Sequence, residues 1–337
     1  MSNKSRRRVK LAAGAILAAA AIPIAAAGTA WADDSTSDQT ETAKQLEGQG
    51  LSKPEAKDVV KAEHHGTPVQ VSYDGTTVVN DHDAGSTPAS ASTLTGSTSD
   101  VAAAIGDGSS ASAGTSSDPT DLGTGGNSDT AFADGANSSA TAVGGNGDVA
   151  TATGPSSEAE AVAGGGNTAT ATDTSRAAGT FTIAVAGGEV SAPGSNDTAT
   201  ADGKNVLAIA SDGDSDNAKA TGTDAIARAE VGNSNTASAD GSAANASGQT
   251  VTTTTAAAGN GNSDMATASG ANAQAYAGAS FVPPDYATTY GSDDTATAQG
   301  NNYDAQAYSG DNLTATATAA NPTIFNDGGV ISYTPPA

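Results

Sequence analysis

The sequence predicts a mainly β protein built as a narrow, Ala-lined β-solenoid of about 19-residue coils, in which the chain winds into stacked layers of short strands. In residues 291–320, alanine occupies every second position of short segments that restart every nine or ten residues, and a period of two is typical of a strand with two distinct faces. The pattern recurs at a constant step, from Ala131 to Ala150 and Ala169. Each unit holds two alternating segments and two Gly/Asn/Asp/Ser breaks, so we expect two strands and two turns per coil.

The alternation also predicts which face of each strand points inwards. The positions between the alanines hold Thr, Ser and charged side chains such as Glu160, Lys219 and Arg228. Because charged groups need water, alanine is expected to line an interior with room for little more than a methyl group. We expect a better-packed central section to form around the larger side chains Phe181, Ile183, Val185, Leu207 and Ile209.

Two other structures fit the same pattern. An antiparallel sheet of nine-residue hairpin units would show the same alternation. Persistent disorder is the other, because burying a methyl-sized group contributes roughly 0.8 kcal/mol, whereas ordering the backbone costs about 1–2 kcal/mol per residue. In a solenoid, ladder hydrogen bonds, stacking along the axis and self-association would have to supply the difference.

The repeat step lengthens at three places. These are the steps from Ala169 to Ala199, from Ala237 to Ala266 and from Ala266 to Ala296. We interpret each as one coil plus an insertion of about ten residues, which would project as a loop from one face of the stack.

The N-terminal segment 1–32 predicts export. A basic head precedes an apolar stretch at 11–28 and an A-x-A site at 30–32, as in a signal peptide. A membrane anchor is the alternative. Ser, Arg and Arg at 5–7 are similar to a twin-arginine signal, so the Sec and twin-arginine routes both stay open. We expect a protein that is secreted, extracellular or loosely associated with the cell envelope, and not membrane-inserted once the signal is removed.

The region before the repeats divides by composition. A capping box at Ser52 and Glu55 predicts the start of a helix, and Asp74-Gly75 between alternating runs predicts a two-residue hairpin turn. The predicted organisation is a signal peptide (1–32), an acidic flexible segment (33–50), a helix plus β-hairpin module (51–83), a Ser/Thr/Gly linker (84–126), the β-repeat solenoid (127–320) and a C-terminal tail (321–337).

Composition excludes several functions. With 37 acidic and 13 basic residues and a net charge of −24, the chain repels nucleic acid. Serine is too abundant to indicate a catalytic triad, and the Gly-rich pieces lack the Lys and Ser/Thr of a phosphate loop. The stretch at 212–217 starts like a calcium loop, but Asn217 and Thr223 replace its Gly and Glu. We expect a protein that is not an enzyme and uses no cofactor.

The three histidines suggest a second function. If positions pair symmetrically about Asp74-Gly75, His82 lies opposite Thr67 and close to His64 and His65. Imidazoles beside carboxylates are ligands for zinc or copper; a solvated helix end is the alternative. The second hypothesis is therefore a metal-binding or sensory helix–hairpin module, with the repeats as a spacer.

Aromatic side chains near the C-terminus form the candidate ligand-binding site. Exposed rings on a polar scaffold can stack on sugars or anchor a protein, so a glycan or a cell-surface protein is the expected partner. Covering the thin end of the solenoid is the alternative role. The candidate residues are Tyr276, Phe281, Tyr286, Tyr290 and Tyr308.

Outward Thr-x-Thr pairs suggest a third function. Regular threonine arrays on flat solenoids resemble those of ice-binding proteins. Here we expect an interrupted array whose pairs do not fall on adjacent coils. The pairs are Thr168/Thr170, Thr198/Thr200, Thr295/Thr297 and Thr314/Thr316.

The repeat units themselves resemble those of known proteins. NSDTAFADGANSSATAVGG and SDDTATAQGNNYDAQAYSG are similar to units of uncharacterised, secreted Ala/Thr/Gly/Asn-rich repeat proteins of actinobacteria, and more weakly to the head repeats of trimeric autotransporter adhesins. Those heads use shorter units with larger aliphatic residues. The resemblance implies a non-enzymatic structural or adhesion-type protein of the cell surface or extracellular matrix.

Overall fold

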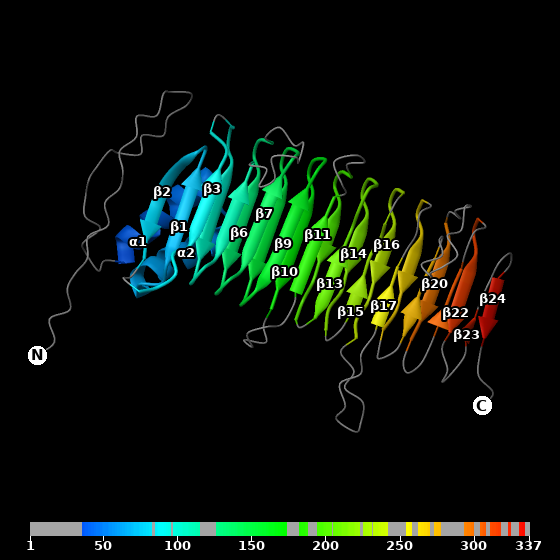
Figure 1. Cartoon of the computed structure of the whole chain (residues 1–337). Helices are drawn as coiled ribbons and strands as arrows, with labels where there is room; N and C mark the ends of the chain where they lie inside the picture. Colours follow the sequence, from blue (N-terminus) through cyan, green and yellow to red (C-terminus); the bar gives the residue numbers. More distant parts are fainter. Residues whose placement is uncertain are drawn as a thin grey trace, which may run out of the picture.

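The protein is mainly β, with long parallel sheets of many short strands, as in a β-solenoid (Figure 1). The computed structural model describes residues 36–82, 85–95, 97–114, 126–173, 182–187, 194–203, 205–222, 225–230, 232–241, 254–257, 262–269, 273–277, 293–299, 304–307, 311–317, 323–324 and 330–333. The predicted signal peptide lies outside this part of the chain. Within it, two helices precede the repeats, α1 (Thr36–Gln49) and α2 (Lys53–His65).

The strands form two sheets, which we call sheet 1 and sheet 2. Sheet 1 runs in the order β2 (Thr76–Asp81), β1 (Val69–Tyr73), β4 (Val101–Ile105), β6 (Thr130–Asp134), β8 (Val149–Thr153), β10 (Thr168–Thr172), β12 (Thr198–Thr200), β14 (Asn217–Lys219), β16 (Thr236–Ser238), β18 (Met265–Thr267), β20 (Thr295–Ala298), β22 (Thr314–Ala317) and β24 (Val330–Tyr333). Sheet 2 runs in the order β3 (Ser90–Thr93), β5 (Ser110–Ala113), β7 (Ser139–Val143), β9 (Ser157–Val162), β11 (Thr182–Ala186), β13 (Val206–Ile209), β15 (Ala225–Ala227), β17 (Thr254–Ala256), β19 (Gln274–Ala275), β21 (Asp304–Ala305) and β23 (Thr323–Ile324).

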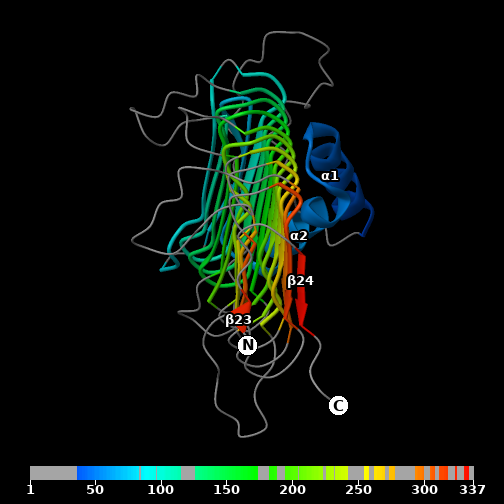
Figure 2. The ribbon, with the colours of Figure 1, turned by 90° about the vertical axis from the view of Figure 1, so that its right-hand side faces the viewer.

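Successive strands of the repeat alternate between the two sheets, and each pairs in parallel with the strand one coil away. Thus β8 pairs with β6 and β10 in sheet 1, while β9 pairs with β7 and β11 in sheet 2. The two sheets face each other in the view of Figure 2. The antiparallel alternative is wrong, because every described pairing between two repeat strands is parallel.

The alanines of neighbouring coils lie side by side. Ala150 pairs with Ala169 across an ordinary repeat step, and Ala169 pairs with Ala199 across the first lengthened step. Ala237, Ala266 and Ala296 are also consecutive neighbours in sheet 1. Each lengthened step therefore spans a single coil. Most of the extra residues lie outside the described part of the chain.

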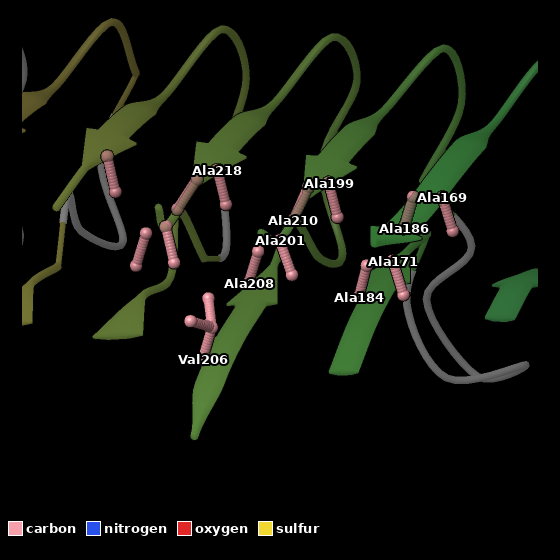
Figure 3. Close-up of a cluster of buried hydrophobic side chains, with 14 of the residues drawn as sticks. Ala169, Ala171, Ala184, Ala186, Ala199, Ala201, Val206, Ala208, Ala210 and Ala218 are labelled. Atoms are coloured by element: carbon pink, nitrogen blue, oxygen red, sulfur yellow. The ribbon is translucent and has the colours of Figure 1, made fainter. Parts of the chain in front are cut away.

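The larger buried hydrophobic cluster of the described residues consists of alanines, apart from Val206 and Leu313. Ala169 and Ala171 of β10 and Ala184 and Ala186 of β11 are fully buried, and Figure 3 shows them with their neighbours projecting from the strands into one cluster. Backbones also approach closely at the turns. A Cβ added to Gly145 would lie 1.5 Å from the carbonyl oxygen of Gly164, so only glycine fits there.

The expected central section of larger side chains is wrong. Ile183 and Leu207 occupy the parity opposite to the buried Ala184 and Ala208 and are half-buried on the outer face of sheet 2. Val185 and Ile209 do the same, and Phe181 lies outside the described residues. Successive side chains of a strand point to opposite faces of the sheet. Because the alanines between them point inwards, these larger side chains point outwards.

Two segments expected to be unstructured contain regular structure. The segment at 33–50 holds α1, whose Ala43 and Leu46 are buried against α2 and the first strands. The expected linker at 84–126 holds β3, β4 and β5. The residues of this segment are too small to build an ordinary hydrophobic core. Its Ala102, Ala104 and Ala111 are nevertheless buried in the same cluster as the alanines of the repeats. The parallel stack of strands therefore begins before residue 127.

The helices and the hairpin cover the N-terminal end of the stack. The hairpin β1–β2 extends sheet 1 by antiparallel pairing of β1 with β4. Gln70 Oε1 accepts from the Ala91 N–H at 2.5 Å, and the Gly75 N–H donates to Thr93 Oγ1 at 2.6 Å, so the hairpin also covers β3. Helices α1 and α2 lie against the outer face of sheet 1 (Figure 2). Neither helix has the length and apolar character needed to cross a bilayer.

Candidate functional site

Of the five predicted aromatic site residues, Tyr276 alone lies in the described part of the chain. Tyr276 is only 9% exposed; its ring packs on Ala257 and its hydroxyl donates to Gln274 Oε1. The expectation that this ring is exposed is therefore wrong, because it covers a neighbouring coil. The other candidates, Phe281, Tyr286, Tyr290 and Tyr308, lie outside the described residues.

The predicted histidine site depends on a hairpin register that the structure changes. A bulge between Val71 and Ser72 shifts the pairing, so Val69 lies opposite Asp81. This moves His82 one position away from the expected pairing with Thr67. No three His, Asp or Glu side chains among the described residues are grouped to hold a metal ion.

The two adjacent histidines contact each other instead. The rings of His64 and His65 pack edge to face, with centroids 5.4 Å apart. His65 Nδ1 lies 2.6 Å from the carbonyl oxygen of Lys61, one helical turn earlier. His65 therefore completes the last turn of α2.

The threonine pairs come together on the outer face of sheet 1. Thr168 and Thr170 of β10 lie beside Thr198 and Thr200 of β12, and the pairs of β20 and β22 are likewise neighbours. The expectation that these pairs are not on adjacent coils is wrong, because β10 pairs directly with β12 and β20 pairs directly with β22. One column reads Thr168, Thr198, Asn217, Thr236, Met265, Thr295 and Thr314; the other reads Thr151, Thr170, Thr200, Lys219, Ser238, Thr267, Thr297 and Thr316. We call these two columns the threonine face.

The threonine face starts where the helices end. Phe132 of β6 occupies the same column as Thr151 but is buried under α1 and α2. Thr151 Oγ1 lies 3.5 Å from Glu55 Oε1 of α2. Farther along, Lys219 is exposed and Met265 is 44% exposed, so the face is polar but not uniform.

A ladder of buried Asp and Asn side chains runs along the same edge of the stack. Each member precedes a sheet 1 strand, and its Oδ1 accepts a hydrogen bond from the backbone N–H at the same position of the next coil, as from Asp148 to Asp129 at 2.9 Å and from Leu313 to Asp294 at 2.6 Å. The members, which we call the Asx ladder, are Asp100, Asp129, Asp148, Asn167, Asp197, Asp216, Asn235, Asp264 and Asp294.

The second carboxylate oxygen of most ladder aspartates is buried without a hydrogen-bond partner. This holds for Oδ2 of Asp100, Asp129, Asp148, Asp197, Asp216 and Asp294. Burial, the largest cause, raises the pKa of Asp129, Asp197 and Asp216 to about 7. It also raises the pKa of Asp148 and Asp294 to about 6, against backbone N–H groups that lower it.

Sequence reasoning missed the ladder because these residues stand in turn-like breaks. A signal was present: Asp129, Asp148 and Asn167 each precede the central alanine of their coil by two positions. A turn needs Asp or Asn at some position, whereas a ladder needs it at the same phase in every coil.

Comparison with known protein families, with curated proteins and with solved structures finds no match to this chain.

Proposed function

We propose that this chain is a non-enzymatic structural or adhesion-type protein, secreted to the cell surface or extracellular matrix, that presents a polar face on a narrow β-solenoid. The proposed coil is the 19-residue repeat unit with an alanine interior. The 19-residue steps from β6 to β8 and β10 and from β12 to β14 and β16, together with the buried alanines, support this architecture. The signal-like segment 1–32 supports secretion.

The threonine face is the observation that carries the proposal. Neighbouring strands of a sheet are about 4.8 Å apart, and alternate residues of one strand are roughly 6.7 Å apart. The two columns therefore form a regular grid in which most positions carry a hydroxyl and a methyl group. Hydroxyls donate and accept hydrogen bonds, as sugar hydroxyls do, and the methyl groups suit the apolar faces of sugar rings.

The net charge of the chain indicates which glycans could bind the threonine face. The chain carries a net charge of −24, which disfavours anionic polymers. Among the described residues of the two columns, the positive charge of Lys219 is the only interruption by a charged group. We propose a neutral or basic glycan chain lying along the solenoid axis as the ligand of this face.

Removing hydroxyls while keeping side-chain shape tests the proposal. Changing Thr170, Thr200 and Thr297 to Val should weaken cosedimentation with insoluble neutral polysaccharide and with isolated cell envelopes by about tenfold, because two or three hydrogen bonds of roughly 0.5–1.5 kcal/mol each are lost. The matched control is Thr141→Val on the outer face of sheet 2. Equal binding by the triple variant and the control would contradict a role for the threonine face.

Ice binding is a second candidate because the threonine pairs lie on adjacent coils. A lattice requires an unbroken array, and Asn217, Lys219 and Met265 break the columns. Glycan adhesion predicts no thermal hysteresis from the purified protein. Hysteresis that the triple Thr→Val variant abolishes would instead favour ice binding.

A further inference from the structure

The Asx ladder poses a problem at the second atom of each side chain. Its first oxygen, Oδ1, accepts a backbone N–H in every coil, as in the step from Asn235 N–H to Asp216 Oδ1 at 2.8 Å. Its second oxygen is fully buried and unpartnered in six aspartates. A buried carboxylate oxygen without a donor is costly, so something must satisfy it.

Asn167 shows what surrounds this second atom. Its Nδ2 donates to the carbonyl oxygens of Ala163 at 2.8 Å, Val162 at 3.2 Å and Gly194 at 3.2 Å. The second atom of this ladder position therefore points into a set of main-chain acceptors. An amide N–H suits that environment, whereas an ionised carboxylate oxygen is repelled by it.

The aspartates of neighbouring coils meet the same kind of acceptor. A Cβ added to Gly126 would lie 2.2 Å from Asp129 Oδ2 and 1.7 Å from the carbonyl oxygen of Gly145. A Cβ added to Gly145 would lie 2.6 Å from Asp148 Oδ2 and 1.5 Å from the carbonyl oxygen of Gly164. Both carboxylates thus lie beside a carbonyl of the following coil, in the place where Asn167 has a donor.

We propose that the six ladder aspartates with a buried, unpartnered Oδ2 are held as neutral carboxylic acids in the folded chain, with each Oδ2–H donating to a main-chain carbonyl, and that the solenoid is therefore stabilised by protons. Folding transfers one proton from solvent to each such carboxylate. No other atom or electron moves.

The charges around the ladder favour the neutral form. The charged groups acting on Asp129 are Asp100 and Asp148, its neighbours in the ladder. Asp197 is acted on by Asp212 and Asp214, and Asp294 by Asp293 and Asp311. Asp216 is acted on by Asp197 and Asp214. All of these groups are acids, so ionising one ladder member raises the cost of ionising the next.

The direction of the pH effect follows from the two states. An aspartate in the unfolded chain has a pKa of about 3.9, and the pKa of folded Asp129 is raised to about 7. Between these values the folded state binds a proton that the unfolded state has released. The stabilisation is fully present below about pH 4 and is lost as the pH rises through about 7.

Equilibrium unfolding of the full chain at a series of pH values tests the proposal. Each ladder aspartate should raise the unfolding constant by up to about tenfold per pH unit between about pH 4 and pH 7. Asp129→Asn and Asp216→Asn supply a permanent donor, so they should leave stability at about pH 4 nearly unchanged and raise it at about pH 8. Asp107→Asn, at an exposed aspartate, is the matched control and should do neither.

A second variant and a spectroscopic measurement test the protonation of the ladder independently of the stability of Asp129→Asn. Asn167→Asp adds one titrating group to the ladder and should steepen the pH dependence. The infrared band of protonated carboxylic acids should be present in the folded protein near neutral pH and weaker in Asp129→Asn.

Two results would overturn the proposal. If Asp129→Asn destabilised the chain equally at low and high pH, an amide N–H would not replace the side chain of Asp129, and Oδ2 would not be acting as a hydrogen-bond donor. Millimolar Ca²⁺ could instead restore stability at high pH in the parent chain but not in Asp129→Asn. The Oδ2 atoms of the Asx ladder would then bind cations rather than protons, because carboxylate and carbonyl oxygens are also calcium ligands.

Discussion

The first and the later coils of sheet 1 share an inward face but differ in what they place outwards. In β4 and β6, the outward Val101, Ile105 and Phe132 are buried beneath the two helices. In β10, the outward Thr168 and Thr170 are half-exposed. The inward side chains of both regions are alanines. The cover above the sheet, rather than the coil itself, decides which outward residues are apolar.

This difference distributes stability unevenly along the stack. The N-terminal coils have a second core, in which Val59 and Leu46 of the helices pack on the sheet. The later coils are stabilised by buried alanine methyl groups, by the hydrogen bonds between parallel strands and by the Asx ladder. We infer that the helices and hairpin act as the N-terminal cap that repeat stacks require.

The largest expected effect comes from emptying the covered face. Phe132→Ala removes a ring that is 3% exposed and should lower the free energy of unfolding by about 3–5 kcal/mol. Thr170→Ala, two coils along the same column, should change it by less than about 0.5 kcal/mol. Urea titration of both variants measures the comparison. Similar losses would mean that the two outward faces are not different environments.

A smaller effect is expected from enlarging the shared inward face. Ala169→Leu inserts a branched side chain between the sheets at a fully buried position, and overpacking of this kind costs about 1–3 kcal/mol. Thr170→Leu also introduces a leucine, but on the outer face, and should cost much less. Thermal unfolding of the pair checks this, and equal tolerance at both positions would contradict a closely packed interior.

The period of the sequence predicted stacked short strands, but it also fitted an antiparallel sheet, and it did not give the extent of the stack. The spacing of the alanines anticipated that Ala150 and Ala169 are neighbours in one sheet. The strands within 84–126 were missed because composition was judged against an ordinary core, which Ser and Ala cannot build. The outward placement of Ile183 was missed because size was weighed above parity.

The candidate sites were harder to predict than the fold. A single bulge in the hairpin displaced His82, and bulges leave no reliable mark on the sequence. Tyr276 was expected to be exposed, yet it covers Ala257 of the neighbouring coil. The Asx ladder depends on which carbonyls surround each side chain, and these belong to residues far away in sequence, such as Gly194 beside Asn167.

The most direct test of the account is a cysteine-accessibility scan across β10, in a chain that has no natural cysteine. Single cysteines would replace Ala169, Thr170, Ala171 and Thr172, with a fifth replacing Phe132 under the helices. We predict fast thiol labelling at 170 and 172 and strong protection at 169, 171 and 132. Equal labelling at all four β10 positions would contradict a solenoid with an alanine interior, and fast labelling at 132 would contradict the cap.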